Sequence, residues 1–408
     1  MDLFRLGHAD LRSLRADAPV HRDEATGLWL VSRYEDVRAV LVDQDAFRPD
    51  NALTAVTPIP GPVLRVLARA GFSLPPTLAN NGTDTHPALR RLVARFLTPG
   101  KVAAMGPRIA ELTRERLDRV TGPTADLHPA LARDLPAVVL LEVLGIRDVD
   151  VPALKAWSTA SLELFWGDPS PARQAGLAVP AAEFHRWLTT RIEAARGDDL
   201  FGALRHEGVS VRDAAGLCYF LLIAGQETTT QLLCALFHGV LRHGDLWRRA
   251  ADPAVAAACV EETLRRDPPV NTWRRVAARR STIAGVEVPE GAHLLLMLAG
   301  TGSDPEVFDN PEAYCPARPN ARKHLAFGFG RHFCLGAGLA RLEGEVVLAE
   351  TARRFPDLRL LDHDPPMLGL LSFRAPLSVS VALGDQDQLA GGGAVLEQLV
   401  GTGGPRQR

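Results

Sequence analysis

The chain has 408 residues, of which 46% are hydrophobic and 23% charged, and its formal net charge is -2. This composition excludes a disordered or fibrous protein, and the near-neutral charge gives no electrostatic basis for nucleic acid as a partner. The longest apolar runs are far shorter than the roughly 18 residues of a membrane-spanning helix, and the N-terminus lacks the apolar stretch of a signal peptide, so we expect a cytoplasmic protein with no membrane segment.

In chain order, the first expected elements are a strand at Trp29–Val31 and a helix at Tyr34–Val42. The helix is predicted because Val37, Val40 and Leu41 recur at helical spacing.

Residues 49–85 are rich in proline and apolar side chains and too irregular for one element, so they predict a long loop of the kind that usually has a function. From 86 to about 268 the pattern is almost entirely helical, broken by glycine and proline. Strand signals return between 282 and 297, where Ala284 and Gly285 can turn a hairpin.

The sequence therefore predicts a mainly α fold, with small β-sheets near the two ends of the helical block. We expect residues 1–384 to form one domain and the glycine-rich residues 385–408 to form a mobile tail.

A long helix is predicted to begin after Ser210, which makes a capping-box-like start with Asp213, and to run to about Gly244. At 1.5 Å per residue it would be roughly 50 Å long and would cross the whole domain. Its middle places Glu227 and Thr228 inside an apolar segment. Burying a carboxylate costs several kcal/mol unless it has partners, so either Glu227 lies on a solvated face or the segment has a function.

Two neighbouring residues favour a functional segment. Gly225 costs about 1 kcal/mol relative to alanine in mid-helix, so we expect it to leave space for something to approach the backbone. Thr228 can bond back to the carbonyl of Ala224, which would distort the helix locally and leave room for water.

The five cysteines are scattered, odd in number and without a C-x-x-C pair, which argues against a disulfide framework and a zinc module. Four are expected to be buried small hydrophobes. The set is Cys218, Cys234, Cys259, Cys315 and Cys334.

Cys334 differs from the others because a glycine-rich loop precedes it and a helical apolar pattern follows it. Unpaired N–H groups at a helix start favour a thiolate, and Gly328, Gly330 and Gly336 permit turns and close approach of a flat cofactor. One alternative is an inert structural cysteine. The other is a zinc site with His324 and His332, but the sequence does not supply the four converging ligands that zinc requires.

Charged residues at helical spacing occur in two further places. Glu262 and Arg265 can meet on one face of a helix that ends before Pro268, although exposed ion pairs would use the same spacing. His86 and Arg90 form a basic stripe with Arg91 and Arg95, for which a solvated face is the alternative.

Two of these segments resemble one protein family. Phe327-Gly-x-Gly-x-His332-x-Cys334-x-Gly is similar to the haem-binding signature of the cytochrome P450 superfamily, and Ala224-Gly225-x-Glu227-Thr228 is similar to its oxygen-activating segment. The chain departs from many bacterial members at Gln226, where histidine is common, and at Gly302-Ser303, where Asn-Arg is common.

This resemblance implies the triangular-prism fold of that superfamily, with haem b between the long helix and the cysteine loop. Cys334 would be the iron ligand, and Glu227 and Thr228 would relay the protons needed to split dioxygen. The resemblance also implies contacts to the cofactor, and a brace behind it made by Glu262, Arg265 and Arg318. The cofactor-binding residues it implies are His86, Arg90, Ala224, Gly225, Arg275, Phe327, His332 and Cys334.

The implied function is that of a haem-thiolate monooxygenase that inserts one oxygen atom of O2 into a C–H bond of a small organic substrate of secondary metabolism. Electrons would come from NAD(P)H through a ferredoxin reductase and a ferredoxin, for which Arg91, Arg95 and Arg331 are candidate contacts. The alternatives are a peroxygenase that uses preformed peroxide and a non-catalytic partner protein.

Two loop segments suggest a finer substrate class. Residues 48–54 and 78–82 are similar to members that β-hydroxylate amino acids tethered to a peptidyl carrier protein. The alternative is any small, partly apolar biosynthetic intermediate.

Overall fold

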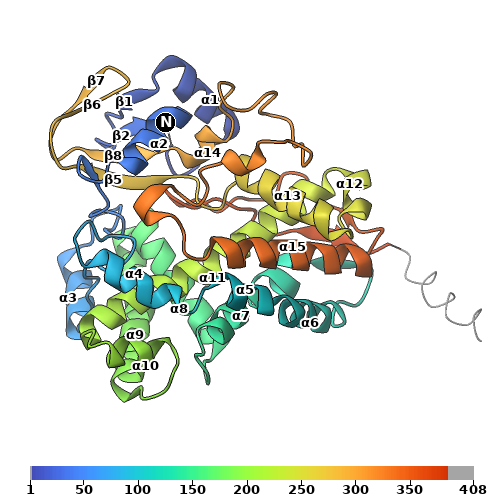
Figure 1. The fold of residues 1–408 in the computed structure, drawn as a ribbon, viewed down its shortest axis with the longest axis horizontal. Coiled ribbons are helices and arrows are strands. Elements are labelled where there is room, and N and C mark those ends of the chain that lie inside the picture. Colours follow the sequence, from blue (N-terminus) through green and yellow to red (C-terminus); the bar gives the residue numbers. More distant parts are fainter. Residues whose placement is uncertain (1, 385–408) are drawn as a thin grey trace, which may run out of the picture.

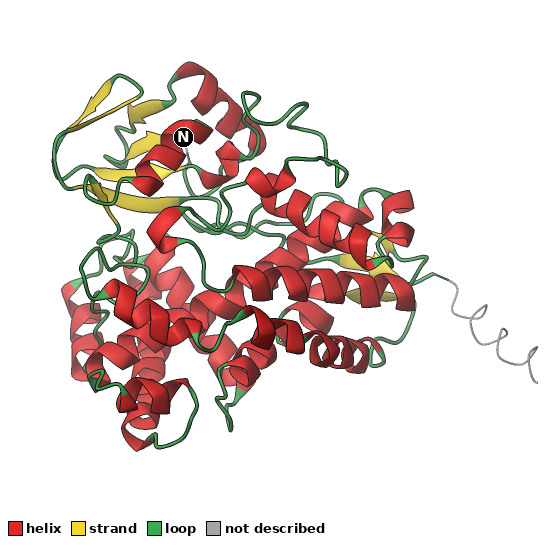
Figure 2. Ribbon diagram, viewed as in Figure 1, coloured by secondary structure: helices red, strands yellow, loops and turns green. Residues whose placement is uncertain are grey.

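The computed structural model describes residues 2–384, so the predicted tail at 385–408 lies outside the described residues. Helices make up most of the molecule, and the main sheet lies at one corner beside α1, α2 and α14 (Figures 1 and 2). The helices are α1 (His8–Asp17), α2 (Tyr34–Val42), α3 (Gly61–Arg69), α4 (His86–Ala94), α5 (Pro99–Ala104), α6 (Gly106–Leu117), α7 (Leu135–Val143), α8 (Val151–Trp166), α9 (Pro171–Ala194), α10 (Leu200–His206), α11 (Val211–Leu241), α12 (Gly244–Arg249), α13 (Pro253–Arg266), α14 (Leu298–Thr301) and α15 (Ala337–Arg354).

The strands form three small sheets. A five-stranded sheet has the order β1-β2-β8-β5-β3, a three-stranded sheet has the order β4-β10-β9, and β6 pairs with β7. In the largest sheet β2 and β8 run parallel, with Trp29 opposite Leu294. The strands are β1 (Val20–Arg22), β2 (Trp29–Val31), β3 (Phe47–Arg48), β4 (Thr124–Asp126), β5 (Trp273–Ala277), β6 (Ser281–Ile283), β7 (Val286–Val288), β8 (His293–Leu296), β9 (Arg359–Leu360) and β10 (Ser380–Ala382).

The long helix α11 runs through the middle of the helical part and begins as predicted, because the Ser210 hydroxyl accepts a hydrogen bond from the Asp213 backbone N–H. It ends at Leu241, three residues before the predicted Gly244. By length and composition α11 could cross a membrane, but 72% of its most apolar window is buried inside the protein. Its apolar character therefore fits a core helix.

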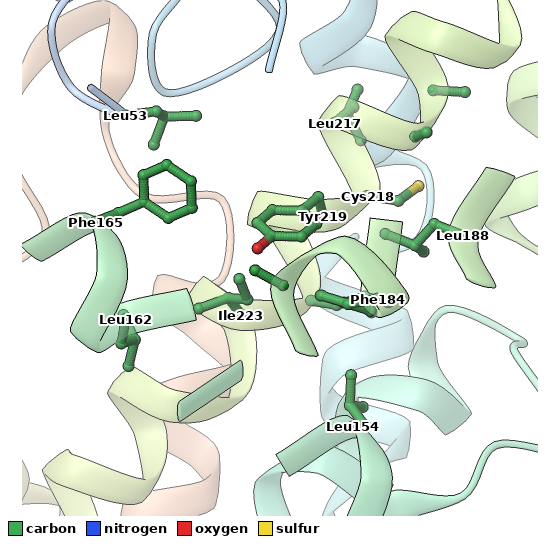
Figure 3. Packing of buried hydrophobic residues seen from close by; sticks show 14 of the residues in the cluster. Leu53, Leu154, Leu162, Phe165, Phe184, Leu188, Leu217, Cys218, Tyr219 and Ile223 are labelled. Carbon is green, nitrogen blue, oxygen red and sulfur yellow. The ribbon is translucent and has the colours of Figure 1, made fainter. Parts of the chain in front are cut away.

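The core around α11 is built from side chains of α8 and α9. Figure 3 shows Phe165, Phe184, Tyr219 and Ile223 packed together, and all four are buried. The Tyr219 hydroxyl is 2.6 Å from the Ser161 hydroxyl, which satisfies the polar end of a ring that is otherwise in apolar surroundings.

Helix α15, which follows the cysteine loop, packs closely on α13. A Cβ at Gly344 would lie 2.9 Å from a methyl group of Val260, so only glycine allows these two backbones to approach this closely. This packing fixes the position of the loop that carries Cys334.

Several expectations from the sequence are confirmed. The strand at Trp29–Val31 and the helix at Tyr34–Val42 have the predicted bounds. The β6–β7 hairpin turns at Ala284 and Gly285, whose φ angles of 49° and 80° both lie in the left-handed region that such two-residue turns require.

Other elements were missed. Residues 49–85, predicted as a loop, contain α3, and β4 lies inside the block predicted to be helical. Strand β4 is only three residues long and is defined by its pairing with β10, about 250 residues later, so no local pattern indicated it.

Candidate active site

A cavity of about 240 Å3 lies between α11 and the loop that precedes α15. It brings together residues of α4, α11, β5 and the cysteine loop, which are far apart in sequence. The sequence-predicted residues that line it are His86, Arg90, Ala224, Gly225, Thr228, Arg275, Phe327, His332 and Cys334. Glu227 does not line this cavity.

The cysteine loop is held by its own backbone. The N–H of Cys334 donates to the carbonyl of Phe327 at 3.0 Å. Gly328 and Gly330 both have a φ of 70°, and a Cβ at Gly330 would lie 3.3 Å from the Leu41 carbonyl oxygen. Glycine is therefore required for the bend that presents the sulfur to the cavity.

Burial by the surrounding protein raises the pKa of the Cys334 thiol. The part of Cys334 that is exposed faces the cavity. Backbone N–H groups of Gly336 and Ala337, together with the Arg90 charge, act in the opposite direction. The helix start therefore favours the thiolate, as predicted, but in the protein without a bound group the effect of burial on the pKa is larger. A bound cation would reverse that balance, because a coordinating thiol is deprotonated.

Hydrogen-bond donors crowd one side of the cavity. The rings of His86 and His332 lie 4.3 Å apart, and Nδ1 of His86 accepts from Nε of Arg331 at 3.2 Å. Arg90 donates to the carbonyl of Phe333 at 2.6 Å, which ties α4 to the cysteine loop. The Nε2 atom of His332 is buried and has no hydrogen-bond partner among the described residues.

The adjacent arginines on β5 point in opposite directions, as alternation along a strand requires. Arg274 donates to the carbonyls of Ala52 and Thr54, at 2.9 Å and 2.7 Å, and so anchors the loop that follows β3. Arg275 lines the cavity, and no residue between 2 and 384 accepts a hydrogen bond from its Nε. This settles which member of the Arg274-Arg275 pair faces the cavity.

The arginines that line the cavity give it an excess of positive charge. Burial, with the charge of Arg331, lowers the pKa of His86 to about 4, and burial with the charge of Arg275 lowers the pKa of His332 to about 3. Burial lowers the pKa of Arg275 to about 10. Among the described lining residues the one carboxylic acid is Glu343, and burial raises its pKa well above its ordinary value, which disfavours the charged form. The cavity therefore fits an anionic group.

Glu227 is buried, which contradicts the alternative of a solvated face. Its Oε1 lies 2.8 Å from Nζ of Lys155 on α8, close enough for an ion pair although not aligned as a hydrogen bond. Lys155 also donates to Oε1 of Gln226 at 2.6 Å and to the hydroxyl of Thr230 at 3.3 Å. The acid thus faces α8, while the next residue along the chain faces the cavity.

Thr228 donates its hydroxyl hydrogen to the carbonyl of Ala224 at 2.6 Å, as predicted. The reason for Gly225 is partly different from the one predicted. A Cβ there would lie 2.8 Å from a methyl group of Leu140 on α7, so the close approach that the glycine permits is that of a neighbouring helix.

Sequence reasoning missed Lys155 and Glu343. Lys155 occupies a buried position in an apolar helix, and Glu343 stands between Leu339 and Val347 at four-residue spacing, on the buried face of α15. In each case a charged residue at an apolar periodic position was the available signal.

Behind the cysteine loop, Glu262 accepts two hydrogen bonds from Arg265, at 2.7 Å and 2.8 Å. It also forms an ion pair with Arg318 at 3.3 Å. The three predicted brace residues therefore meet. The neighbouring Glu261 pairs with His324 instead, and within residues 2–384 no cluster of metal-binding side chains supports the zinc alternative.

Only part of the predicted basic stripe is available to bind a partner protein. Arg91 is exposed, whereas Arg95 pairs with Glu207 at 2.7 Å. Arg331 donates to the carbonyl of Thr83 and to His86, so it joins the cysteine loop to the segment before α4.

Comparisons with known proteins agree with this geometry. The family model described as Cytochrome P450 matches residues 251–368. The chain is 33% identical over 371 residues to the erythromycin C-12 hydroxylase of Saccharopolyspora erythraea, covering 88% of this chain and 89% of that protein.

Two solved structures are similar over nearly their whole length. Cytochrome P450 CREJ in complex with (4-ethylphenyl) dihydrogen phosphate has a TM-score of 0.90 and 30% identity, covering 94% of this chain and 98% of that chain. P450BioI in complex with hexadec-9Z-enoic acid ligated acyl carrier protein has a TM-score of 0.82 and 26% identity, covering 92% and 97%. The predicted mainly α triangular-prism fold with small β-sheets is confirmed.

Proposed function

The chain belongs to the cytochrome P450 family of monooxygenases, and on that premise we propose that Cys334 holds the iron of haem b in the cavity between α11 and the cysteine loop. The observation that carries the proposal is the convergence of Cys334, Thr228 and unneutralised arginines on one cavity. A haem-thiolate group, when bound, supplies the electron-transfer and oxygen-activating chemistry of this family.

The donors around the cavity suit the two carboxylates of a haem. Within residues 2–384, Arg275 and His332 each have a buried nitrogen without a partner, and burial raises the pKa of the one lining carboxyl group, that of Glu343, well above its ordinary value. Arginine binds carboxylates through its planar set of donors, and histidine adds one more. We assign His86, Arg90, Arg275 and His332 to the haem propionates.

Phe327, Ala224 and Gly225 are assigned to the surfaces that contact the flat faces of the haem. Phe327 belongs to the cysteine loop, and Ala224 and Gly225 belong to the middle of α11, so they line the cavity from opposite elements. Their small or planar side chains suit a flat group.

Proton delivery is the task we assign to Thr228 and Glu227. Insertion of one oxygen atom consumes R–H, O2, two electrons and two protons and yields R–OH and water. Because the Thr228 hydroxyl hydrogen is donated to the Ala224 carbonyl, its oxygen lone pairs remain available to accept from water in the cavity. Glu227, the next residue, forms an ion pair with Lys155 on the side away from the cavity, so its carboxylate would first accept a proton from water and then release it toward Thr228.

Isotope labelling tests this proposal with any substrate that shifts the spin state of the ferric protein. With NAD(P)H, a ferredoxin and its reductase under 18O2, we expect one labelled oxygen atom per product molecule. Peroxide-supported turnover that exceeds turnover with reductant would instead establish the peroxygenase alternative, and purified chain that takes up no haem would establish a non-catalytic partner.

We propose a ferredoxin as the electron donor and the cytoplasm as the location. The exposed Arg91 and the half-buried Arg331 are candidate contacts for an acidic partner. Replacing Arg91 by glutamate is expected to slow reduction and to lessen its dependence on salt, whereas an unchanged salt dependence would remove Arg91 from the contact.

For the substrate we propose an intermediate of bacterial secondary metabolism, and more finely an amino acid tethered to a peptidyl carrier protein. One similar structure, that of P450BioI, holds an acyl carrier protein. In the two resembling segments only Leu78 and Ala79 line the cavity, while Asn80 and Asn81 make hydrogen bonds within their own loop. A spin-state shift with aminoacyl carrier but not with free amino acid is expected, and no shift with any aminoacyl carrier would exclude this class.

A further inference from the structure

Four aromatic side chains form a closed ring of contacts at one wall of the cavity. They come from the end of α8 (Trp166), from α11 (Phe220), from β5 (Trp273) and from the segment before β10 (Phe373). Their ring centroids are separated, in order around the ring, by 6.0, 6.4, 6.4 and 5.5 Å. These separations lie within the range of favourable aromatic pairs. We call this group the aromatic wall.

Backbone and side-chain hydrogen bonds join the segments that carry the aromatic wall. The N–H of Leu371 donates to the carbonyl of Trp166 at 2.8 Å, and the hydroxyl of Thr272 donates to the carbonyl of Leu371 at 2.7 Å. Val270 forms an antiparallel bridge with Phe373. These contacts fix the segments of Trp166, Trp273 and Phe373 relative to one another, so three of the four rings are preorganised.

Three of the four rings line the cavity. Phe220 and Trp273 are half-buried and offer the most surface to a ligand, Phe373 is 3% exposed, and Trp166, 2% exposed, does not line the cavity. Trp273 lies two residues before Arg275 on β5, so both side chains are on the same face of the strand. Trp166 thus supports the lining rings Phe220 and Phe373 from behind.

The surroundings of this wall do not suit a charged ligand. The arginines that line the cavity are Arg90 and Arg275, which we assign to the haem carboxylates, and burial disfavours the charged form of Glu343 by raising its pKa.

We propose that the aromatic wall selects substrates that present an uncharged aromatic ring to the faces of Phe220 and Trp273. The inference rests on the proposed function, because it takes the cavity to be the site of oxidation. Apolar area alone would favour any hydrophobic group equally, whereas aromatic pairing adds a preference for ring faces and edges.

Titration of the ferric holoprotein tests this, with the spin-state shift as the measure of binding. The probes are ethylbenzene, ethylcyclohexane and 2-phenylethylammonium, which separate aromatic character, apolar bulk and positive charge. We expect ethylbenzene to bind most tightly. Trp273→Leu is expected to weaken ethylbenzene by roughly 2- to 10-fold and to leave ethylcyclohexane nearly unchanged, because leucine keeps an apolar surface but removes the aromatic pair.

Trp187→Leu is the matched control. Trp187 stacks with Phe184 at 6.1 Å and does not line the cavity, so all three affinities should remain as in the unchanged protein. If Trp273→Leu fails to fold, Phe220→Leu on α11 makes the same test.

Equal weakening of both hydrocarbons in the variant, or tightest binding of the ammonium probe, would overturn the proposal. Neither result would affect the proposed function, which fails separately if the protein binds no haem through a thiolate.

Discussion

Two buried charge clusters, one behind the cysteine loop and one at the centre of α11, differ in how completely their atoms are paired. Glu262 is fully buried, and its oxygens accept from Arg265, from Arg318 and from the N–H of Cys315. Arg265 donates its remaining hydrogens to backbone carbonyls. This brace has no spare donor or acceptor in its centre.

The cluster at the centre of α11 is incompletely paired. Lys155 and Glu227 form an ion pair. In the part of the chain that the structure describes, however, neither the buried Nε2 of Gln226 nor the hydroxyl of Ser158, one turn after Lys155, has a hydrogen-bond partner. Buried polar groups of this kind are places where ordered water binds. The comparison teaches that a saturated charge cluster holds the fold, whereas an unsaturated one leaves buried polar atoms that ordered water can satisfy, as the proposed proton delivery requires.

Replacing Glu227 by glutamine should have the largest effect, because it removes the ionisable group and keeps the shape. General acid–base groups contribute about 10^2- to 10^4-fold to rate, so we expect turnover to fall by at least about a hundredfold, with a larger solvent isotope effect. Product formation in H2O and D2O measures this. Glu207→Gln, at an exposed acid, is the control. A Glu227→Gln rate within a few-fold of the unchanged protein would contradict the assignment.

Replacing Arg265 by alanine tests the saturated cluster. It leaves Glu262 buried without its main cation, which should lower the free energy of unfolding by about 3–5 kcal/mol. Urea unfolding of the holoprotein measures the loss. Arg248→Ala removes an exposed ion pair with Asp357 and should have little effect. Similar losses in both variants would show that the brace is no stronger than a surface pair.

Replacing Gly225 by alanine asks whether this glycine serves helix packing. The new methyl group would meet Leu140, so we expect destabilisation of about 1–3 kcal/mol. Adding Leu140→Ala removes the obstacle, and the double variant should be more stable than the sum of the two single changes predicts. Strict additivity in thermal unfolding would mean that Leu140 is not the reason for the glycine.

Replacing Glu343 by glutamine should change the pH dependence of stability. Burial raises the pKa of this carboxyl group in the folded state above the value of 4.5 that it has when unfolded. The unfolded chain therefore loses this proton first as pH rises, so the carboxyl group costs stability above about pH 4.5, by up to about 1.4 kcal/mol per pH unit until the folded group also ionises.

Glutamine has no such titration, so the stability of Glu343→Gln relative to the unchanged protein should increase from pH 5 to pH 7. Urea unfolding at several pH values measures the difference. A difference that stays constant with pH would indicate that Glu343 has a partner that keeps it ionised.

The local parts of the site were predictable from the sequence. The glycine-rich loop around Cys334 and the back-bonded Thr228 depend on residues within a few positions of each other, and the structure has both as expected. The partners of Glu227 were not predictable, because Lys155 lies 72 positions earlier and reaches α11 only through the packing of α8.

The same reason explains the other misses. Strand β4 exists only through its pairing with β10, and the need for Gly225 depends on Leu140 of another helix. The aromatic wall joins four segments between Trp166 and Phe373. Features defined by long-range contacts leave little trace in local residue patterns.

The most direct test of the account is the spectrum of the carbon monoxide adduct of the reduced protein. Iron held by the Cys334 sulfur is expected to give a thiolate-type band, and Cys334→Ser should abolish it, while Cys315→Ser, at a half-buried cysteine that does not line the cavity, should retain it. An imidazole-type band in the unchanged protein, or full oxidation activity in Cys334→Ser, would contradict the central claim.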